Sequence, residues 1–312
     1  MNTVSVITVC YNAAATLEKT IQQVLAQTYE PLEYIVIDGA STDETPEILA
    51  RYGDRLCWVS EPDDGLYAAM NKGIAKATGD WLYFANADDY LLDAAVIADV
   101  MAFIAGNPDV DFIYGNHETR HRSGDRRIYE PAAPEDMLTE MVYLGNCFIQ
   151  PASFFNVRCF ERLGPFCNRY KIAADYDWFI RLLAHPSLTV RHYPRAIASY
   201  AQGGASSDIR ALFAEVFEIQ NQVPLYQTPE WRSRRLETLQ RHFTDKYARL
   251  EERHRAVVAR EQRIEALETQ LRDLEAEAGE LSGQLAAMKT SKFWKLREGW
   301  FRIKRRLGLP AD

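Results

Sequence analysis

Four groups of polar residues follow short apolar runs in the N-terminal part of the chain, and their types suit the binding of a nucleoside diphosphate. They occupy residues 8–12 (TVCYN), 38–43 (DGASTD), 61–73 (EPDDG leading into MNKG) and 86–89 (NADD). A pyrophosphate is commonly bridged by a hard divalent cation, which prefers carboxylate oxygen. Gly39 and Gly65 would let the backbone approach a ligand closely. Each group alone also fits a turn or a helix cap, so it is the four together that predict a site.

The apolar runs before these groups predict buried β-strands, because they are rich in β-branched and aromatic residues and end at Asn, Asp or Gly. The expected strands are residues 4–9, 34–38, 56–59 and 81–85, with helices at 15–27, 43–52 and 65–77 between them. This alternation indicates a parallel sheet, in which ligands bind beyond the carboxyl ends of the strands. The four polar groups are therefore expected to meet at one edge.

Further elements would complete an α/β domain over residues 1–225. Strands are expected at 112–114 and 196–201, with a helix at 173–184 between them. At the sheet edge, Asp88 and Asp89 could bind a metal ion, and backbone groups of residues 8–11 with the Asp38 carboxylate could pair with a nucleobase.

With these motifs in place, the chain resembles glycosyltransferase family 2, the inverting enzymes of the GT-A fold, which is a Rossmann-like mixed sheet flanked by helices. The resemblance implies transfer of one sugar from a nucleotide sugar, with a uridine diphosphate sugar favoured, to a hydroxyl acceptor. No Q-x-x-R-W stretch follows, which favours single transfer over processive synthesis. The segments that carry the resemblance are VSVITVCYNAAATLEKTIQQVLAQTY, IDGASTDET, SEPDDGLYAAMNKGIAKATGDWLYFANADD, PASFFNVRCFERLGPF and AADYDWFIRL, spread over about residues 1–205.

The resemblance also implies roles for matching positions. Asp38 resembles the acid that reads the base. The NADD group is similar to the metal-binding D-x-D motif, with Asn86 in place of its first acid, so Asp88 and Asp89 would hold the ribose and a divalent metal, Mn²⁺ or Mg²⁺. Which of the two is the main metal ligand stays open. The residues expected to bind the nucleotide sugar are Thr8, Tyr11, Asp38, Asp63, Asp64, Lys72 and Asp88.

The catalytic base implied by the resemblance is Asp175 in the segment AADYDW, with Asp177 in a supporting or structural role. Ala174 stands where the family more often has Glu, and an acid at a helix start can also simply favour the positive end of the helix dipole. The implied reaction has one displacement: Asp175 deprotonates the acceptor hydroxyl, which attacks the anomeric carbon with inversion. Residues 202–206 (QGGAS) resemble a glycine loop of the family, or form a plain surface turn.

Two other classes of function stay open. A nucleotidyltransferase shares the architecture and the metal acids, but residues 8–20 lack its usual glycine- and arginine-rich phosphate loop. A coiled-coil scaffold with a degenerate catalytic domain is disfavoured because Asp88, Asp89 and Asp175 are all present.

Residues 226–290 predict a long helical stalk, because glycine and proline almost vanish and Glu, Arg, Gln, Leu and Ala dominate. Residues 264–288 give nearly four heptads, which predict a homodimeric coiled coil. This heptad register fails upstream, where Arg253 and Arg260 fall on d positions. A single exposed amphipathic helix is the alternative to the coiled coil. The a and d residues are Ile264, Leu267, Leu271, Leu274, Ala278, Leu281, Leu285 and Met288.

The tail, residues 291–312, is basic and aromatic. Residues 289–312 carry eight Lys or Arg against Glu298 and Asp312, a charge of +6, which leaves −14 for the rest of a chain whose net charge is −8. Its apolar residues recur at helical spacing, which predicts an interfacial helix over 291–307 that contacts anionic lipid. A lipid-linked glycan acceptor would suit this location, while packing on the same chain or on a partner subunit is the alternative. The apolar residues are Phe293, Leu296, Trp300, Ile303 and Leu307.

Composition narrows the remaining possibilities. The negative charge outside the tail argues against a nucleic-acid partner, which needs a broad basic surface. Five cysteines without C-x-x-C spacing support neither a zinc site nor a disulfide framework, and favour a reducing compartment. Nowhere do eighteen apolar residues occur in sequence. We therefore expect a cytoplasmic protein at the inner face of the cell membrane.

Overall fold

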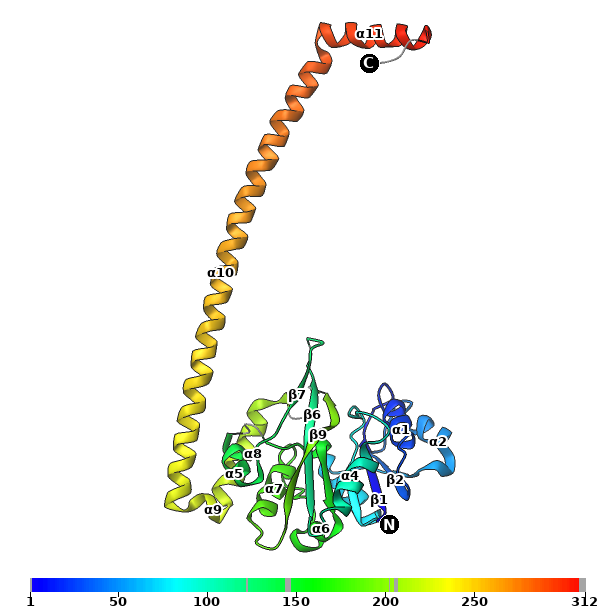
Figure 1. Cartoon of the computed structure of the whole chain (residues 1–312), viewed down its shortest axis with the longest axis vertical. Helices are drawn as coiled ribbons and strands as arrows, with labels where there is room; N and C mark the ends of the chain where they lie inside the picture. Colours follow the sequence, from blue (N-terminus) through cyan, green and yellow to red (C-terminus); the bar gives the residue numbers. More distant parts are fainter. Residues whose placement is uncertain (1, 122, 144–146, 202, 205–206, 309–312) are drawn as a thin grey trace. The chain divides into compact units, whose positions relative to one another are not determined.

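The computed structural model describes residues 2–121, 123–143, 147–201, 203–204 and 207–308. The chain divides into two compact units, residues 1–241 and 242–312. Figure 1 shows the first unit as a twisted sheet with helices on both faces and the second as two helices.

A mixed sheet of nine strands forms the centre of the first unit, in the order β3-β2-β1-β4-β8-β6-β9-β5, with β7 paired to β6. Neighbours from β3 to β4 are parallel, β8 is antiparallel to both β4 and β6, and β9 runs parallel to β6. The strands are β1 (Val4–Cys10), β2 (Leu32–Asp38), β3 (Cys57–Ser60), β4 (Trp81–Phe84), β5 (Tyr90–Leu91), β6 (Phe112–Arg120), β7 (Arg126–Tyr129), β8 (Ser153–Asn156) and β9 (Val190–Ala201).

Alternate residues of the central strands enter two separate cores, one on each face of the sheet. On β1, Ile7 and Val9 belong to one core while Val4 and Val6 belong to the other, as the two-residue period of a strand requires. The first core is covered by α3 (Leu66–Lys76), α5 (Pro134–Glu140), α6 (Val157–Leu163), α7 (Ala174–Ala184) and α8 (Ile209–Gln222). The second is covered by α1 (Leu17–Leu25), α2 (Thr45–Tyr52) and α4 (Val96–Ala105).

This architecture confirms the predicted α/β class, the mixed sheet flanked by helices and the long C-terminal helix. The strands β6 and β9 are longer than the expected 112–114 and 196–201. The reason is that the added residues are largely polar and only their burial alternates: on β6, His117 and Thr119 are buried while Asn116 and Glu118 are partly exposed. A search for apolar runs finds only the fully buried part of such a strand.

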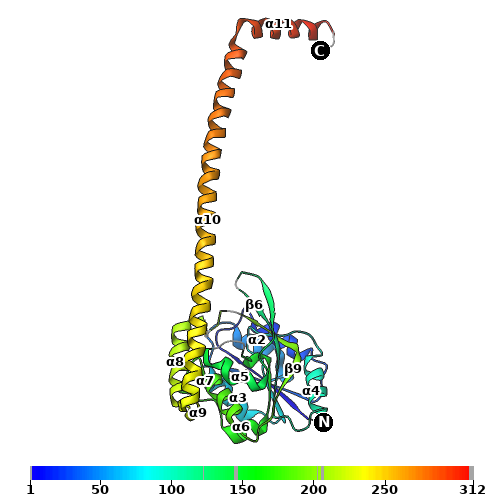
Figure 2. The ribbon, with the colours of Figure 1, turned by 60° about the vertical axis from the view of Figure 1, so that its left-hand side comes forward.

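The helix α10 (Pro229–Thr290) starts within the first unit. Figure 2 shows its first turns beside α8 and α9 (Pro224–Gln227). There the rings of Trp231 and Tyr226 meet edge to face with centroids 5.1 Å apart, and Thr238 is also buried. The first unit therefore extends to residue 241, sixteen residues beyond the boundary at 225 expected from composition.

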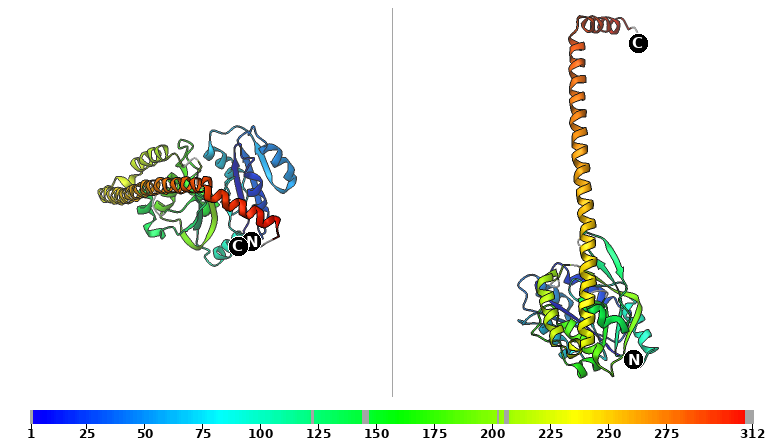
Figure 3. Two further views of the ribbon diagram at one scale, coloured as in Figure 1. Left: turned by 90° about the horizontal axis from the view of Figure 1, so that it is seen from above. Right: turned by 90° about the vertical axis from the view of Figure 1, so that its left-hand side faces the viewer.

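The second unit consists of the remainder of α10 and α11 (Lys292–Arg306). Figure 3 shows α10 as one unbroken helix that ends where α11 begins. Ser291 separates the two helices, and its hydroxyl caps α11 by accepting a hydrogen bond from the Trp294 amide at 3.3 Å. Within the described residues, no helix is long and apolar enough to cross a membrane.

Candidate active site

The loops after β1 and β2 interlock at the carboxyl edge of the sheet. Asn12 has a positive φ of 49°, and its side-chain oxygen accepts a hydrogen bond from the Thr42 amide at 2.8 Å. Gly39 lies beside the Tyr11 ring and the Asp63 carboxylate, and an added Cβ would meet Asp63 Oδ2 at 3.4 Å and Tyr11 Cδ2 at 3.5 Å. The structure thus brings Tyr11 and Asp63, from separate loops, next to one glycine. Tyr11 is 65% exposed and presents its ring to solvent.

Thr8 and Asp38 lie below this surface, because both side chains are fully buried. The Thr8 hydroxyl lies 3.1 Å from the Tyr34 hydroxyl inside the core. The Asp38 carboxylate accepts hydrogen bonds from the Ser41 hydroxyl at 2.5 Å, the Ser41 amide at 3.1 Å and the Ser60 hydroxyl at 2.6 Å. In this conformation both residues fix the loops that follow their strands, and Tyr11 is the member of the predicted set that offers exposed surface there.

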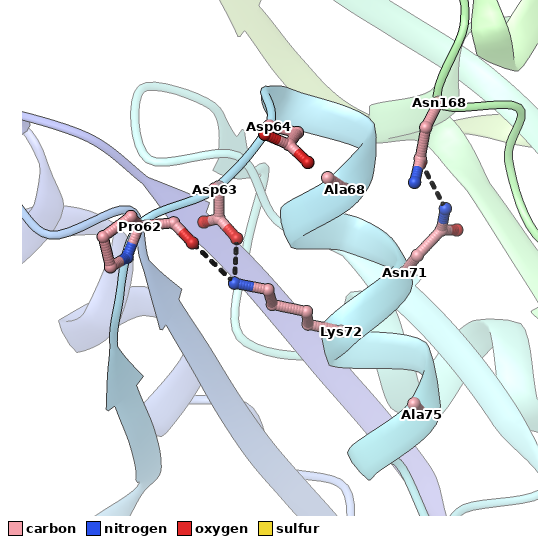
Figure 4. A pocket seen from close by; sticks show the side chains of 8 residues that line it. All are labelled: Pro62, Asp63, Asp64, Ala68, Asn71, Lys72, Ala75 and Asn168. Atoms are coloured by element: carbon pink, nitrogen blue, oxygen red, sulfur yellow. Dashed lines mark hydrogen bonds and ion pairs between the residues drawn. The ribbon is translucent and has the colours of Figure 1, made fainter.

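A surface pocket of about 470 Å³ contains Asp63, Asp64 and Lys72, three of the residues predicted to line the nucleotide. Figure 4 shows Lys72 pointing from α3 toward the loop before it, where its Nζ donates to the Pro62 carbonyl at 3.0 Å and pairs with Asp63. Glu61 is a further ion-pair partner at 2.8 Å. Hydrogen bonds to Asp63 and Glu61 raise the pKa of Lys72, so it stays charged, and in this conformation its ammonium is held by these two carboxylates and the Pro62 carbonyl.

Two glycines bring the pocket helix α3 close to the sheet. Gly65, just before the helix, has a φ of +116°, which other residues rarely adopt. A Cβ at Gly73 would overlap the Ile7 side chain on β1, so only glycine allows this distance between helix and strand. The face of α3 that lines the pocket, including Ala68, Asn71 and Lys72, points away from the sheet.

The predicted base, Asp175, lies in the first turn of α7 and is partly exposed. Its Oδ1 atom lies 2.8 Å from the Tyr67 hydroxyl and accepts a hydrogen bond from the Tyr176 amide at 2.8 Å. Within the described chain, no hydrogen bond occupies its other oxygen, Oδ2. Burial raises the pKa of Asp175, while the Tyr67 hydrogen bond lowers it. A carboxylate with one oxygen held and the other open can accept a proton from a bound hydroxyl.

Tyr67 and Glu215 hold the start of α7 from two sides. Tyr67 is on α3 and is buried, and its hydroxyl lies 2.8 Å from the Ile172 carbonyl as well as from Asp175. Glu215 on α8 accepts hydrogen bonds from the amides of Lys171 at 2.8 Å, Ile172 at 2.9 Å and Ala173 at 2.9 Å. A carboxylate at a helix N-terminus satisfies amides that have no partner within the helix and interacts favourably with the helix dipole. The base is therefore tied through Tyr67 to the helix that carries Lys72.

An aromatic cluster attaches the rest of α7 to the sheet. Trp178 is fully buried, and its ring packs against Phe155 at a centroid distance of 5.3 Å and against Phe160 at 4.8 Å. Its indole N–H donates to the Gly164 carbonyl at 3.0 Å. Asp177 forms an ion pair with Arg181 at 3.1 Å, one turn along the same helix. These contacts support the structural role expected for Asp177.

Asp88 and Asp89 follow β4 but lie in different environments. Asp89 is 3% exposed; its Oδ1 accepts from the Ala201 amide at 2.9 Å and its Oδ2 from the Asn86 side chain at 3.0 Å. Burial, and then the charge of Asp88, raise the pKa of Asp89 to about 7. Asp88 is partly exposed, and within the described residues its carboxylate has no hydrogen-bond donor. The open carboxylate is therefore that of Asp88, while Asp89 braces the loop against β9.

Arg120 holds the Asp88 backbone in place. Its guanidinium donates to the Asp88 carbonyl and also to the Ser199 carbonyl at 2.6 Å and hydroxyl at 2.8 Å. It also lies over the Tyr90 ring, 4.1 Å from the centroid, while Lys19 covers the same ring at 3.8 Å. These contacts link the loop after β4 to β6 and β9.

Whether this loop fits a divalent metal depends on its donor atoms. No group of three or more His, Cys, Asp or Glu side chains suited to a metal occurs among the residues that the structure describes. Mg²⁺ at phosphate sites is commonly bound through one or two carboxylates, with substrate phosphate and water completing its shell. One open carboxylate at Asp88 fits that mode of binding, and Asp89 as placed does not.

Tyr67, Arg120 and Glu215 were not predicted from the sequence. Tyr67 lies between Gly65 and Lys72, within one of the polar groups singled out in the sequence. It could have been identified there as a buried residue on the helix whose exposed face lines the pocket. Glu215 lies about forty residues beyond the amides it caps, so no local pattern reveals it. Gln202, Ala205 and Ser206 of the expected glycine loop lie outside the described residues, and Gly203, within the loop, has a φ of +135°.

Comparison with known proteins decides the family. Residues 5–161, half of the chain, match the sequence profile described as Glycosyl transferase family 2. The chain belongs to this family. Its membership makes it a glycosyltransferase and confirms the resemblance drawn from the motifs.

Curated relatives of this family 2 glycosyltransferase include mycobacterial enzymes. A PGL/p-HBAD biosynthesis glycosyltransferase of Mycobacterium bovis is 35% identical over 213 residues, which cover 66% of this chain and 79% of the relative. An uncharacterised glycosyltransferase of Mycobacterium tuberculosis is 34% identical over 194 residues, 61% of this chain and 72% of the relative.

Solved structures show the same fold at lower identity. The Staphylococcus aureus TarS fragment 1–349 in complex with UDP has a TM-score of 0.58 at 20% identity, covering 78% of this glycosyltransferase and 72% of that chain. The mannosyltransferase PcManGT of Pyrobaculum calidifontis, in complex with GDP-Man and Mn²⁺, has a TM-score of 0.52 at 20% identity, covering 77% and 75%.

Proposed function

We propose that this glycosyltransferase moves one sugar from a nucleoside diphosphate sugar, favouring a uridine diphosphate donor, to a hydroxyl group of a lipid-linked glycan or polysaccharide precursor, with inversion at the anomeric carbon. The observation that carries the proposal is the link between Asp175 and the pocket. Tyr67 joins the open carboxylate to α3, and the next turn of α3 places Lys72 beside Asp63. Base and anion-binding group are thereby positioned by one helix.

Asp175 acts in this proposal as the general base. Its free Oδ2 removes the proton of the acceptor hydroxyl as the oxygen attacks the anomeric carbon, and the bond to the nucleoside diphosphate breaks on the opposite side. The elevated pKa of Asp175 makes it a better proton acceptor than an exposed aspartate, while Tyr67 keeps enough of it ionised. Inversion follows from a single displacement.

Donor binding is assigned to the residues at the sheet edge. Lys72 neutralises phosphate charge, and Asp63 and Asp64 line the same pocket. Tyr11 offers its ring to the base, while Thr8 and Asp38 fix the loops that carry the recognition groups. The TarS fragment was solved with UDP-GlcNAc, which supports a nucleotide-sugar donor here.

A divalent metal, Mn²⁺ or Mg²⁺, is proposed at Asp88, with Asp89 holding the loop. When bound, such a cation neutralises charge that develops on the leaving diphosphate. Arg120 places the Asp88 backbone for this purpose through its bond to the carbonyl oxygen. The Mn²⁺ in the PcManGT complex is in line with this assignment.

The second unit is proposed to connect two copies and to contact a membrane. Self-association is assigned to residues 264–288, whose large apolar side chains are 46% to 62% exposed. The membrane contact is assigned to residues 291–307, where Phe293, Leu296, Trp300 and Ile303 line a shallow apolar groove with Lys295 and Arg297. Aromatic residues flanked by cations suit the headgroup region of an anionic bilayer at the inner face of the cell membrane.

The activity can be tested with a panel of nucleotide sugars. Purified protein is incubated with each donor and Mn²⁺, and both hydrolysis and transfer to a lipid-linked acceptor pool are measured. We expect one donor to be consumed well above the others, with a β-linked product from an α-linked donor. Release of pyrophosphate from a nucleoside triphosphate and a sugar phosphate, without any donor consumption, would instead identify a nucleotidyltransferase.

A further inference from the structure

The apolar face of α10 continues toward the N-terminus beyond the heptads at 264–288. Steps of seven residues back from Ile264 lead to Val257, Leu250 and Phe243, which are 50%, 62% and 71% exposed. Residues seven apart occupy the same side of a helix and here continue the a positions. Because an apolar stripe of this length is unfavourable in water, it indicates a partner helix that covers residues 243–288 and not only the C-terminal half.

The d positions divide this stripe into two unlike halves. The C-terminal half has leucine at positions 267, 274 and 281, whereas the N-terminal half has Lys246, Arg253 and Arg260. In a parallel pair in register, each d residue faces its own counterpart. Three cations would then meet three identical cations, and like charges brought together at an interface are destabilising. A parallel pair therefore does not cover the N-terminal half.

The charges of the two halves are opposite. Residues 242–263 carry six Lys or Arg and four Asp or Glu, a net +2, whereas residues 264–288 carry one Arg and six Asp or Glu, a net −5. Two such helices that run in opposite directions place the positive half of each beside the negative half of the other. Charge complementarity of this kind selects both the partner and its orientation.

We propose that α10 pairs with α10 of a second copy of this chain in antiparallel orientation, with residues 243–260 of each helix packed on residues 264–281 of the other. This inference rests on the proposed self-association and specifies its surface and direction. It also gives the N-terminal half of the stripe a partner.

The register follows from placing Arg260 opposite the partner's Ile264. Every layer then joins an a residue of one helix to a d residue of the other, as antiparallel packing requires. No cation faces another cation; instead its aliphatic stem covers an apolar residue of the partner. The apolar layers pair Phe243 with the partner's Leu281, Leu250 with the partner's Leu274 and Val257 with the partner's Leu267. The other layers pair Lys246 with the partner's Ala278, Arg253 with the partner's Leu271 and Arg260 with the partner's Ile264.

The same register brings acids beside each of these cations. Positions that flank the layers place the partner's Glu275 and the partner's Glu277 on either side of Lys246. The partner's Glu268 lies beside Arg253, and the partner's Glu261 beside Arg260. Partly buried cations with acidic neighbours are far less costly than unpaired ones. In the parallel register the residues that follow Lys246 and Arg253 are Tyr247 and His254, which offer no acid, and only Arg260 has an acidic neighbour, Glu261.

Disulfide trapping in the full-length chain distinguishes the orientations. Leu250→Cys and Leu274→Cys are prepared separately with Cys57→Ser, because Cys57 is an exposed native thiol, and with tags of different size. In a glutathione buffer the antiparallel pair predicts roughly tenfold more cross-linking in the mixture than in either variant alone, since a disulfide needs its Cα atoms within about 7 Å. Strong cross-linking of each variant with itself indicates a parallel pair and overturns the inference.

A charge-swap series tests the same point without cysteine. Arg253→Glu brings an acid to the partner's Glu268, so the dissociation constant from sedimentation equilibrium should rise by about tenfold, and adding Glu268→Arg should restore it. A parallel pair predicts little change from Arg253→Glu and no rescue by Glu268→Arg, because residue 253 would still face its own counterpart with like charge. A chain that stays monomeric overturns both this inference and the proposed self-association, whereas sugar transfer to a soluble acceptor is measured separately and tests the catalytic proposal alone.

Discussion

The hydrogen bond between Tyr67 and Asp175 should set the pH at which the enzyme becomes active, and Tyr67→Phe removes it together with the contact of the same hydroxyl with the Ile172 carbonyl. The ring of Tyr67 packs on Phe166 with centroids 5.6 Å apart, and phenylalanine keeps that contact. The lost hydroxyl lies 2.8 Å from the carboxylate. Its own pKa is raised well above the ordinary value by burial, so it remains a neutral donor throughout the assay range.

The size of the effect follows from the bond that is lost. A hydrogen bond to a charged group contributes about 1.5 kcal/mol or more, and 1.36 kcal/mol corresponds to a factor of ten. Because the bond favours the ionised carboxylate, its removal raises the pKa of Asp175. On the acidic limb of the pH profile, kcat/KM should therefore fall by about tenfold, and the difference should close at high pH, where the carboxylate is ionised in both proteins.

Glu215→Gln provides the matched comparison, because it acts on the same carboxylate with the opposite sign. Glu215 adds a negative charge near Asp175 and so raises its pKa. Its neutral replacement should move the acidic limb toward lower pH, although kcat should also fall because fewer amides at residues 171–173 are held. The reasoning is refuted if both variants lose activity uniformly across pH, since that outcome means a purely structural role.

Five other changes test separate parts of the site, the fold and the appendage. Asp88→Asn should reduce transfer by about two orders of magnitude or more, as expected for a lost metal ligand, with an unchanged Tm. Asp89→Asn should match or exceed the wild-type Tm at pH 8. The reason is that the pKa of Asp89 is raised to about 7, so its stabilising contribution is lost as pH rises through that value. Full activity of Asp88→Asn in excess chelator would exclude the metal assignment. Gly73→Ala forces a methyl group against Ile7 and should cost about 1–3 kcal/mol in a urea titration, whereas Gly279→Ala, with open space around it, should not destabilise. Deletion of residues 289–312 should release the protein from anionic vesicles and spare transfer to a soluble acceptor; continued pelleting of the truncated chain with vesicles would exclude the tail as the anchor.

The sequence predicted those parts of the fold that have a strong local pattern. Buried parallel strands such as β1 and β2 are continuous apolar runs, and the polar groups at their ends identify the edge where they meet. The half-polar strands β6 and β9 were predicted too short, and β8 was missed, because its apolar run consists of only Phe154 and Phe155. The first unit also extends into the start of α10, where Trp231 and Thr238 are buried. The sequence did not predict this, because the composition of that part of the helix resembles that of the exposed stalk.

The candidate site was predictable as a set of residues but not as an arrangement. Sequence reasoning placed Asp88 and Asp89 together, whereas only burial separates the open carboxylate from the one bonded to the Ala201 amide. Asp38 illustrates the same limit, because nothing local indicates that the hydroxyl groups of Ser41 and Ser60 occupy its oxygens. Long-range contacts such as that between Glu215 and residues 171–173 depend on tertiary packing alone.

The most direct test of the central claim is the comparison of donor binding and turnover in Asp175→Asn. The amide preserves shape and can still accept the Tyr67 hydrogen bond, but it does not remove a proton from the acceptor. We predict donor affinity within about twofold of wild type by calorimetry, and a kcat lower by roughly three orders of magnitude at saturating donor and acceptor. Collapsed donor affinity with surviving turnover at saturation would contradict the account and make Asp175 a binding residue.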